Sequence, residues 1–197
     1  VSDIEITYVG TTEFKPTRIS EMFKDKKCNY TIVHDGGLGY SQNDASVPNG
    51  RKIDLSKEDW FAFEDNFGTS EEKAFVAYFK SFIPRLKEKY DKVFLVRNER
   101  QLHIYSFDGG ERFEPDYLLF LHKQNDAGYE QLQVFIEPKG THLISDDKWK
   151  EDFLLEIEDK AVTTKIFVDD NKYKIWGFHF FNTDVRMNEF AKDMDRL

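Results

Sequence analysis

The sequence has little cysteine, no long apolar run and no clustered metal-ligand pattern. Cys28 is the single cysteine, so an internal disulfide is excluded and a reducing cytoplasm is the expected location. No apolar run approaches the roughly 20 residues that a membrane-spanning helix needs, and no basic start followed by an apolar stretch indicates a signal peptide. The histidines show no ligand spacing, so no zinc site is expected. These absences exclude a membrane protein and a disulfide scaffold.

An excess of basic residues is also missing. The chain has 28 Lys and Arg against 37 Asp and Glu, a net charge of −9, whereas a protein that binds DNA alone usually has a basic face. Either the positive charge is concentrated locally, or another protein or domain delivers a nucleic acid; we favour the second. The hydrophobic content of 40% and the 19 phenylalanines indicate a packed globular chain. The start at Val1 without Met indicates a fragment or a processed product.

Hydrophobic spacing predicts helices and strands along the chain. Residues 69–90 have the spacing of an amphipathic helix, with Thr69 or Ser70 as N-cap, and Pro84 is expected to kink it or to start a second short helix. Short connections between the strands that follow favour antiparallel neighbours. The expected strands are 4–9, 30–33, 92–98, 102–107, 113–122, 130–139, 163–168 and 173–181. Residues 34–51 are expected to form a loop. Two further helices are expected, one over residues 146–160 and one from a cap at Thr183 or Asp184 to about Met194. This order predicts an α/β fold with a mixed central β-sheet flanked by helices on both faces.

Two carboxylates and a lysine could form a metal-dependent site. Glu137 and Lys139 lie two apart on a predicted strand, so their side chains leave the same face. Asp116 follows Pro115 on the preceding strand, and a hairpin would bring it beside Glu137. Carboxylates repel at short range unless a cation lies between them, and hard oxygen ligands suit Mg²⁺.

Such a site could hydrolyse a phosphodiester. The carbonyl of Pro138 is a further candidate ligand for Mg²⁺. Lys139 could stabilise charge on the phosphate, orient a water or, with a depressed pKa, act as a base. Glu-x-Lys occurs four times in this chain, and only the copy at Glu137 lies on a predicted strand. The alternative interpretation is a surface ion pair between Glu137 and Lys139, with Asp116 marking a turn.

Several blocks of sequence resemble a known nuclease family. RFEPDYLLFL, QVFIEPKG, DDKWKEDFL, the upstream NFGTSEEKAF and VRNE at residues 96–99 together resemble the C-terminal endonuclease domain of the restriction (Res) subunit of type III restriction-modification enzymes. The resemblance covers roughly residues 60–160 and implies a fold of the PD-(D/E)xK nuclease superfamily. Carried over by position, it implies that Asp116 and Glu137 are metal ligands and that Lys139 is the catalytic lysine.

The resemblance also implies partners. In that family the subunit holds an ATP-driven helicase motor, and this chain has no GxxxxGK[ST] motif, so ATP would act only through a motor region outside it. A methyltransferase (Mod) subunit would recognise the sequence in double-stranded DNA. The expected organisation is an N-terminal strand and loop segment of unclear role over residues 1–60 and a nuclease domain over 61–197. Other functions remain open: a non-catalytic docking module of the restriction subunit, or a stand-alone repair nuclease of the same fold.

Three further residues are candidates for supporting roles. Glu72 lies in line with the apolar face of its helix and could reach the metal; the alternative is a capping box with Thr69. Lys150 could contact a substrate phosphate, or could be an ordinary surface lysine. His142 could contact phosphate, or could be an exposed loop residue.

Overall fold

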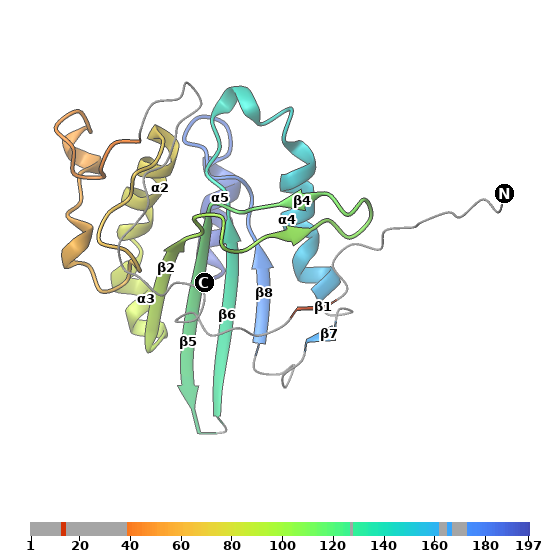
Figure 1. Ribbon diagram of the computed structural model, residues 1–197. Coiled ribbons are helices and arrows are strands. Elements are labelled where there is room, and N and C mark those ends of the chain that lie inside the picture. Colours follow the sequence, from red (N-terminus) through yellow and green to blue (C-terminus); the bar gives the residue numbers. More distant parts are fainter. Residues whose placement is uncertain (1–12, 15–38, 127, 162–164, 167–172) are drawn as a thin grey trace.

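A mixed sheet forms the centre of the fold. The computed structural model describes residues 13–14, 39–126, 128–161, 165–166 and 173–197. The sheet has the order β2-β5-β6-β8 (Figure 1), with bounds Lys92–Arg97, Tyr117–Asn125, Gly128–Ile136 and Tyr173–Gly177. Strands β2 and β6 run antiparallel to β5, whereas β8 runs parallel to β6. The predicted α/β class with a mixed central sheet is therefore confirmed.

The other elements surround this sheet. The helices are α2 (Ser70–Lys80), α3 (Ile83–Lys89), α4 (Lys148–Ala161) and α5 (Met187–Asp195). Two small ladders pair β3 (Ile104–Tyr105) with β4 (Arg112–Phe113), and β1 (Glu13–Phe14) with β7 (Lys165–Ile166). Single 3₁₀ turns are η1 (Asn49–Arg51), η2 (Leu55–Lys57) and η3 (Thr141–Leu143). No helix in these described ranges is both long enough and apolar enough to cross a membrane.

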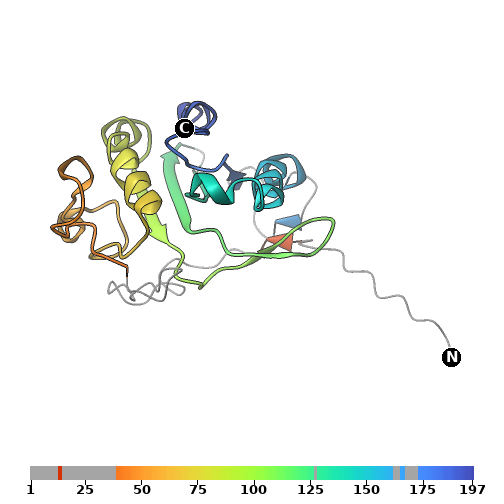
Figure 2. The ribbon, with the colours of Figure 1, turned by 90° about the horizontal axis from the view of Figure 1, so that it is seen from above.

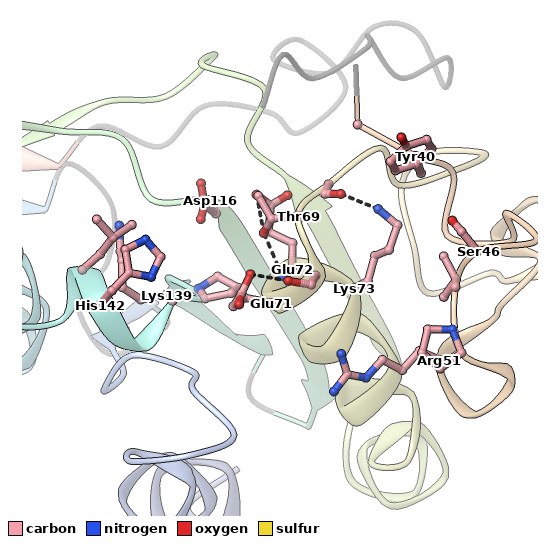
Figure 3. A pocket seen from close by; sticks show the side chains of 18 residues that line it. Tyr40, Ser46, Arg51, Thr69, Glu71, Glu72, Lys73, Asp116, Lys139 and His142 are labelled. Atoms are coloured by element: carbon pink, nitrogen blue, oxygen red, sulfur yellow. Dashed lines mark hydrogen bonds between the residues drawn. The ribbon is translucent and has the colours of Figure 1, made fainter. Parts of the chain in front are cut away.

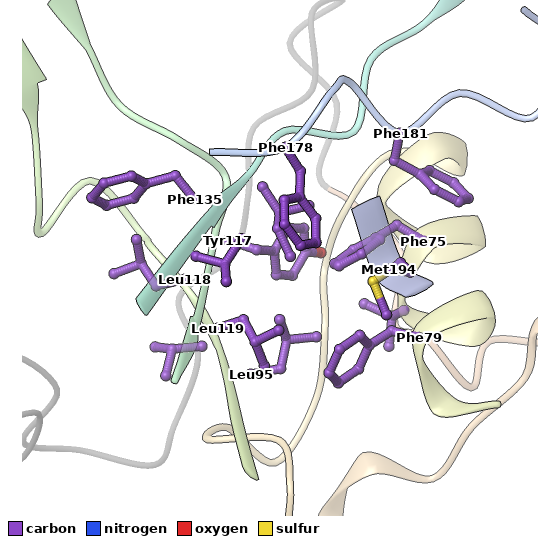
Figure 4. Packing of buried hydrophobic residues seen from close by; sticks show 14 of the residues in the cluster. Phe75, Phe79, Leu95, Tyr117, Leu118, Leu119, Phe135, Phe178, Phe181 and Met194 are labelled. Carbon is purple, nitrogen blue, oxygen red and sulfur yellow. The ribbon is translucent and has the colours of Figure 1, made fainter. Parts of the chain in front are cut away.

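Helices cover both faces of the sheet. On one face the ring of Phe75 from α2 packs against Tyr117 of β5, with 4.9 Å between the ring centroids (Figure 4). Phe135 of β6 points to the other face, and Gly177 is its partner in the ladder with β8. A Cβ at Gly177 would lie 2.1 Å from the backbone oxygen of Leu154 in α4, so only glycine allows this close approach.

The segment before α2 is part of the same core. Val47, Leu55 and Trp60 are buried, and Phe61 bridges to Leu95 at the outer edge of β2. The predicted loop over residues 34–51 is described only from residue 39, where it consists of turns and η1. The predicted strands 4–9 and 30–33 lie outside the described residues. The boundary at residue 60 remains a prediction.

Proline sets several element boundaries. Pro84 lies in the first turn of α3, so the predicted helix 69–90 is two helices. Of the two expectations for Pro84, the start of a second short helix is confirmed. The predicted strand 113–122 is instead broken between β4 and β5, with Pro115 in the gap, because proline cannot donate to a ladder. Asp116 consequently lies just before β5 rather than inside a strand.

The predicted cap of the last helix is wrong. Helix α5 begins at Met187 with Arg186 as N-cap, and no side chain caps it. The amides of Asp184 and Val185 instead donate to the side-chain oxygen of Asn182, at 2.9 and 2.8 Å. Asn182 therefore stabilises the turn that precedes α5 and does not cap the helix itself.

Candidate active site

The hairpin of β5 and β6 brings Asp116 and Glu137 together. Tyr117 pairs with Ile136 at the end of the ladder, so the next residues outward are opposite each other. The backbone N–H of Asp116 donates to Glu137 Oε2 at 3.0 Å. This end of β6 lies between α2 and α4 in both views (Figures 1 and 2). The pairing that was expected from the short hairpin connection is confirmed.

Strand-like pairing continues past the end of β6 and orients Lys139. Pro138 bridges to Phe181: the amide of Phe181 donates to the Glu137 carbonyl at 3.0 Å, and the amide of Lys139 donates to the Phe181 carbonyl at 2.9 Å. Lys139 Nζ lies 2.7 Å from Glu137 Oε1. Both side chains thus leave the same face, as their spacing predicted, and the three residues Asp116, Glu137 and Lys139 form one contiguous group.

Asp147 is a fourth member that sequence patterns did not single out. It precedes α4 and accepts a hydrogen bond from Lys139 Nζ at 2.9 Å through Oδ2. Its other oxygen lies 2.7 Å from Lys150 Nζ, and Lys150 also stacks over Trp149. Lys150 is therefore tied to the site through Asp147, while its predicted contact with substrate phosphate stays a prediction.

Burial and like charges dominate the electrostatics. Burial raises the pKa of Asp116 well above its usual value, and the Glu137 and Glu72 carboxylates raise it further. Burial also raises the pKa of Glu137, against the influence of Lys139. Burial alone would lower the pKa of Lys139, but its carboxylate neighbours Glu137 and Asp147 more than reverse this and raise it. Without a bound metal these neighbours favour the charged form of Lys139, and the role of a base beside a metal stays a prediction.

Glu72 is held by an arginine. Thr69 Oγ1 accepts from the Glu72 amide at 3.3 Å, so the predicted N-cap is confirmed. The Glu72 carboxylate has two neighbours. Its Oε1 accepts a long hydrogen bond of 3.5 Å from the Thr69 hydroxyl, and its Oε2 lies 2.8 Å from Arg97 Nη2 as an ion pair without a hydrogen bond. Both side chains are less than a tenth exposed. A Cβ at Gly68 would lie 2.3 Å from the same oxygen, so Glu72 is closely packed as well as paired.

A cleft of about 730 Å³ opens beside this group. Asp116, Lys139 and His142 line one side of it, and Glu71 and Glu72 lie at its middle (Figure 3). Pro138 is also among the residues that line the cleft. His142 packs against Gly140, whose added Cβ would lie 3.0 Å from the imidazole ring. His142 is exposed and lines the cleft, and its contact with phosphate stays a prediction. Lys150 is not among the residues that line the cleft.

The donor set at this place fits a divalent cation. The carboxylates of Asp116 and Glu137 carry like charges that repel each other, and a cation bound between them would relieve that repulsion. Across the described ranges, no group of three His, Cys, Asp or Glu side chains is arranged as a metal site. A cation here would therefore need the Pro138 carbonyl and solvent beside the two carboxylates, which is how Mg²⁺ is commonly bound.

Comparisons with known proteins place this chain among uncharacterized relatives. The family model HI_1054_C, described as a C-terminal domain, matches residues 7–195. An uncharacterized protein of Haemophilus influenzae is 32% identical over 195 residues, covering 95% of this chain and 39% of that protein. The chain thus spans about two fifths of the length of this relative. No solved structure matches significantly.

Proposed function

Starting from the finding that the chain belongs to the HI_1054_C family, we propose that it is the Mg²⁺-dependent endonuclease domain of a type III restriction enzyme, with a PD-(D/E)xK fold. One observation carries the proposal. Asp116 and Glu137 face each other at the end of a hairpin, and Lys139 contacts Glu137 from two residues further on. A scaffold has no use for two adjoining carboxylates that destabilise each other, whereas a metal-dependent nuclease requires them.

Each residue of the group then has a defined task. Asp116, Glu137 and the Pro138 carbonyl would hold Mg²⁺, which supplies Lewis-acid polarisation of the scissile phosphodiester. Lys139, kept charged by its carboxylate neighbours, would stabilise the negative charge that builds up on the phosphate. Asp147 positions Lys139 by accepting a hydrogen bond from the same Nζ that contacts Glu137. Glu72 is assigned no direct part in this arrangement because Arg97 occupies its carboxylate.

The net negative charge of the chain indicates that it needs partners to reach DNA. A net charge of −9 repels a polyanion on average, so other parts of the assembly must bring the substrate. The proposed partners are double-stranded DNA, the helicase and ATPase region of the same subunit, and the methyltransferase (Mod) subunit that recognises the sequence. Such a restriction complex would act in the cytoplasm.

A cleavage assay with the assembled protein tests this function. The full-length protein that carries this chain, combined with its methyltransferase subunit and ATP, is expected to cut double-stranded DNA in Mg²⁺. Excess EDTA is expected to abolish cutting, and added Mg²⁺ to restore it, because the carboxylate pair needs its cation. Cutting that survives EDTA, or an assembled protein that cuts in neither Mg²⁺ nor Mn²⁺, would contradict the proposal.

A further inference from the structure

The cleft has a second wall that the proposed chemistry does not use. Opposite Lys139 and His142 it is lined by residues from the segment before α2, among them Tyr40, Ser46 and Arg51 (Figure 3). The volume of about 730 Å³ is that of a site for a small molecule or a single nucleotide, and not for a whole duplex. A single nucleotide of a strand that reaches Asp116 would fit between the two walls.

Tyr40 presents an aromatic ring on a fixed backbone. Its side chain is 64% exposed, one of few large hydrophobic side chains so exposed in the described part of the chain. The backbone beneath it is held by an antiparallel bridge to Gly68. At Gly39 a Cβ would lie 2.6 Å from the Phe67 carbonyl oxygen, so the backbone here packs closely against the backbone of residues 67 and 68. An exposed ring on a rigid support is suited to stacking against a planar ligand.

Arg51 is anchored in a similar way. Its amide donates to Pro48 at 2.8 Å, and its carbonyl accepts from Gln42 Nε2 at 2.7 Å. Gln42 is fully buried and accepts from Asn66, which in turn accepts from the hydroxyl of Tyr117 at 3.0 Å. Tyr117 is the neighbour of Asp116 in sequence. A buried polar network therefore ties the wall that carries Arg51 to the strand that carries the first carboxylate.

The other cations of the cleft are already engaged. Lys73 Nζ donates to the Gly68 carbonyl, and Lys139 Nζ is bound by Glu137 and Asp147. The guanidinium of Arg51, in contrast, has no hydrogen-bond or ion-pair partner among the described residues. Within the described part of the chain, an anionic ligand would therefore displace no partner of this guanidinium.

We propose that Tyr40 and Arg51 form a nucleotide subsite across the cleft from Lys139. Arg51 contacts a backbone phosphate of the strand that is cut, and Tyr40 stacks on an unstacked base of that strand. This inference rests on the proposed nuclease function and adds the form of its substrate: a strand with one base out of the duplex stack at the cleavage point.

Binding of labelled oligonucleotides tests the subsite. Fluorescence anisotropy would follow a short single-stranded oligothymidine and a matched duplex on the full-length protein, with Ca²⁺ replacing Mg²⁺ to prevent cutting. Tyr40→Ala is expected to weaken single-strand binding about tenfold, and Tyr40→Phe to leave it unchanged because the ring remains. Arg51→Ala is expected to weaken it about tenfold and to lower the slope of log affinity against log salt by about one.

Matched controls separate the subsite from general charge effects. Arg112→Ala removes one exposed arginine from β4, outside the cleft, and is expected to change little. Equal losses for Arg112→Ala and Arg51→Ala, or loss of affinity with Tyr40→Phe, would overturn the subsite, and so would failure of the wild-type protein to bind. Unaltered thermal melting of each variant shows that folding is intact. Wild-type-like binding by Tyr40→Ala and Arg51→Ala would refute the subsite alone. The nuclease function is tested separately, by the EDTA experiment and by cleavage with Asp116→Asn.

Discussion

Asp116→Asn is expected to reduce DNA cleavage by the assembled protein about 10³-fold or more, because an amide cannot replace a carboxylate as a ligand of Mg²⁺. The backbone amide of Asp116 still donates to Glu137, so the hairpin end keeps its shape. In the absence of metal the same variant is expected to melt at a temperature a few degrees higher. The reason is that it removes a half-buried carboxyl group whose pKa is raised by desolvation and by Glu137.

The control for this variant is Asp108→Asn. Asp108 is exposed in the turn between β3 and β4 and does not line the cleft, so its loss is expected to alter neither cleavage nor melting. Initial cleavage rates and calorimetric melting curves of both variants would be compared. Cleavage within a few-fold of wild type by Asp116→Asn, in a complex that assembles normally, would remove Asp116 from the active site.

Arg97→Met is expected to destabilise the protein by about 3–5 kcal/mol, which lowers the melting temperature by about 10 °C. The substitution leaves the buried Glu72 carboxylate without its partner and removes the hydrogen bond from Arg97 Nη1 to the Phe67 carbonyl at 2.7 Å. The freed charge would also lie near Asp116, whose pKa Glu72 already raises. Chemical denaturation followed by tryptophan fluorescence would measure the free energy of unfolding.

Two comparisons make the Arg97 result specific. The double variant Arg97→Met with Glu72→Leu is expected to recover most of the loss, because two apolar side chains leave no buried charge. Lys148→Met breaks the exposed ion pair with Asp152 on α4 and is expected to have little effect. An effect of Arg97→Met as small as that of Lys148→Met would show that the Glu72–Arg97 pair is not buried as described.

Local patterns were sufficient to predict much of the site. The short connection between β5 and β6 fixed their pairing, and the ladder register then placed Asp116 opposite Glu137. The spacing of two between Glu137 and Lys139 placed both side chains on one face. These inferences succeeded because each depends on neighbours within one hairpin, where periodicity and turn length determine geometry.

Partners from distant segments were not predictable. Arg97 pairs with Glu72 across 25 positions, and nothing in the surrounding pattern distinguishes it from a surface arginine at the end of a strand. Asp147 lay in the first turn of the predicted helix 146–160 and showed no sign that it would face Lys139. Ion pairs between distant residues depend on how helices and strands pack against one another. The spacing of residues along the sequence does not reveal that packing.

The wall formed by Tyr40 and Arg51 was missed for a related reason. Its segment is rich in glycine, asparagine, serine and proline, a composition that indicates loop structure. The contacts that hold it run from Gln42 to Asn66 and on to Tyr117, three residues spread over the chain. Such a buried polar network becomes visible only once the fold brings its members together.

Anomalous diffraction from crystals of the protein soaked in Mn²⁺ is the most direct test of the central claim, because it locates the cation independently of any assay. The account predicts one strong peak between the carboxylates of Asp116 and Glu137, close to the Pro138 carbonyl, and its loss in crystals of Asp116→Asn. A well-ordered site without a peak at high Mn²⁺, or a peak that stays in Asp116→Asn crystals, would contradict it.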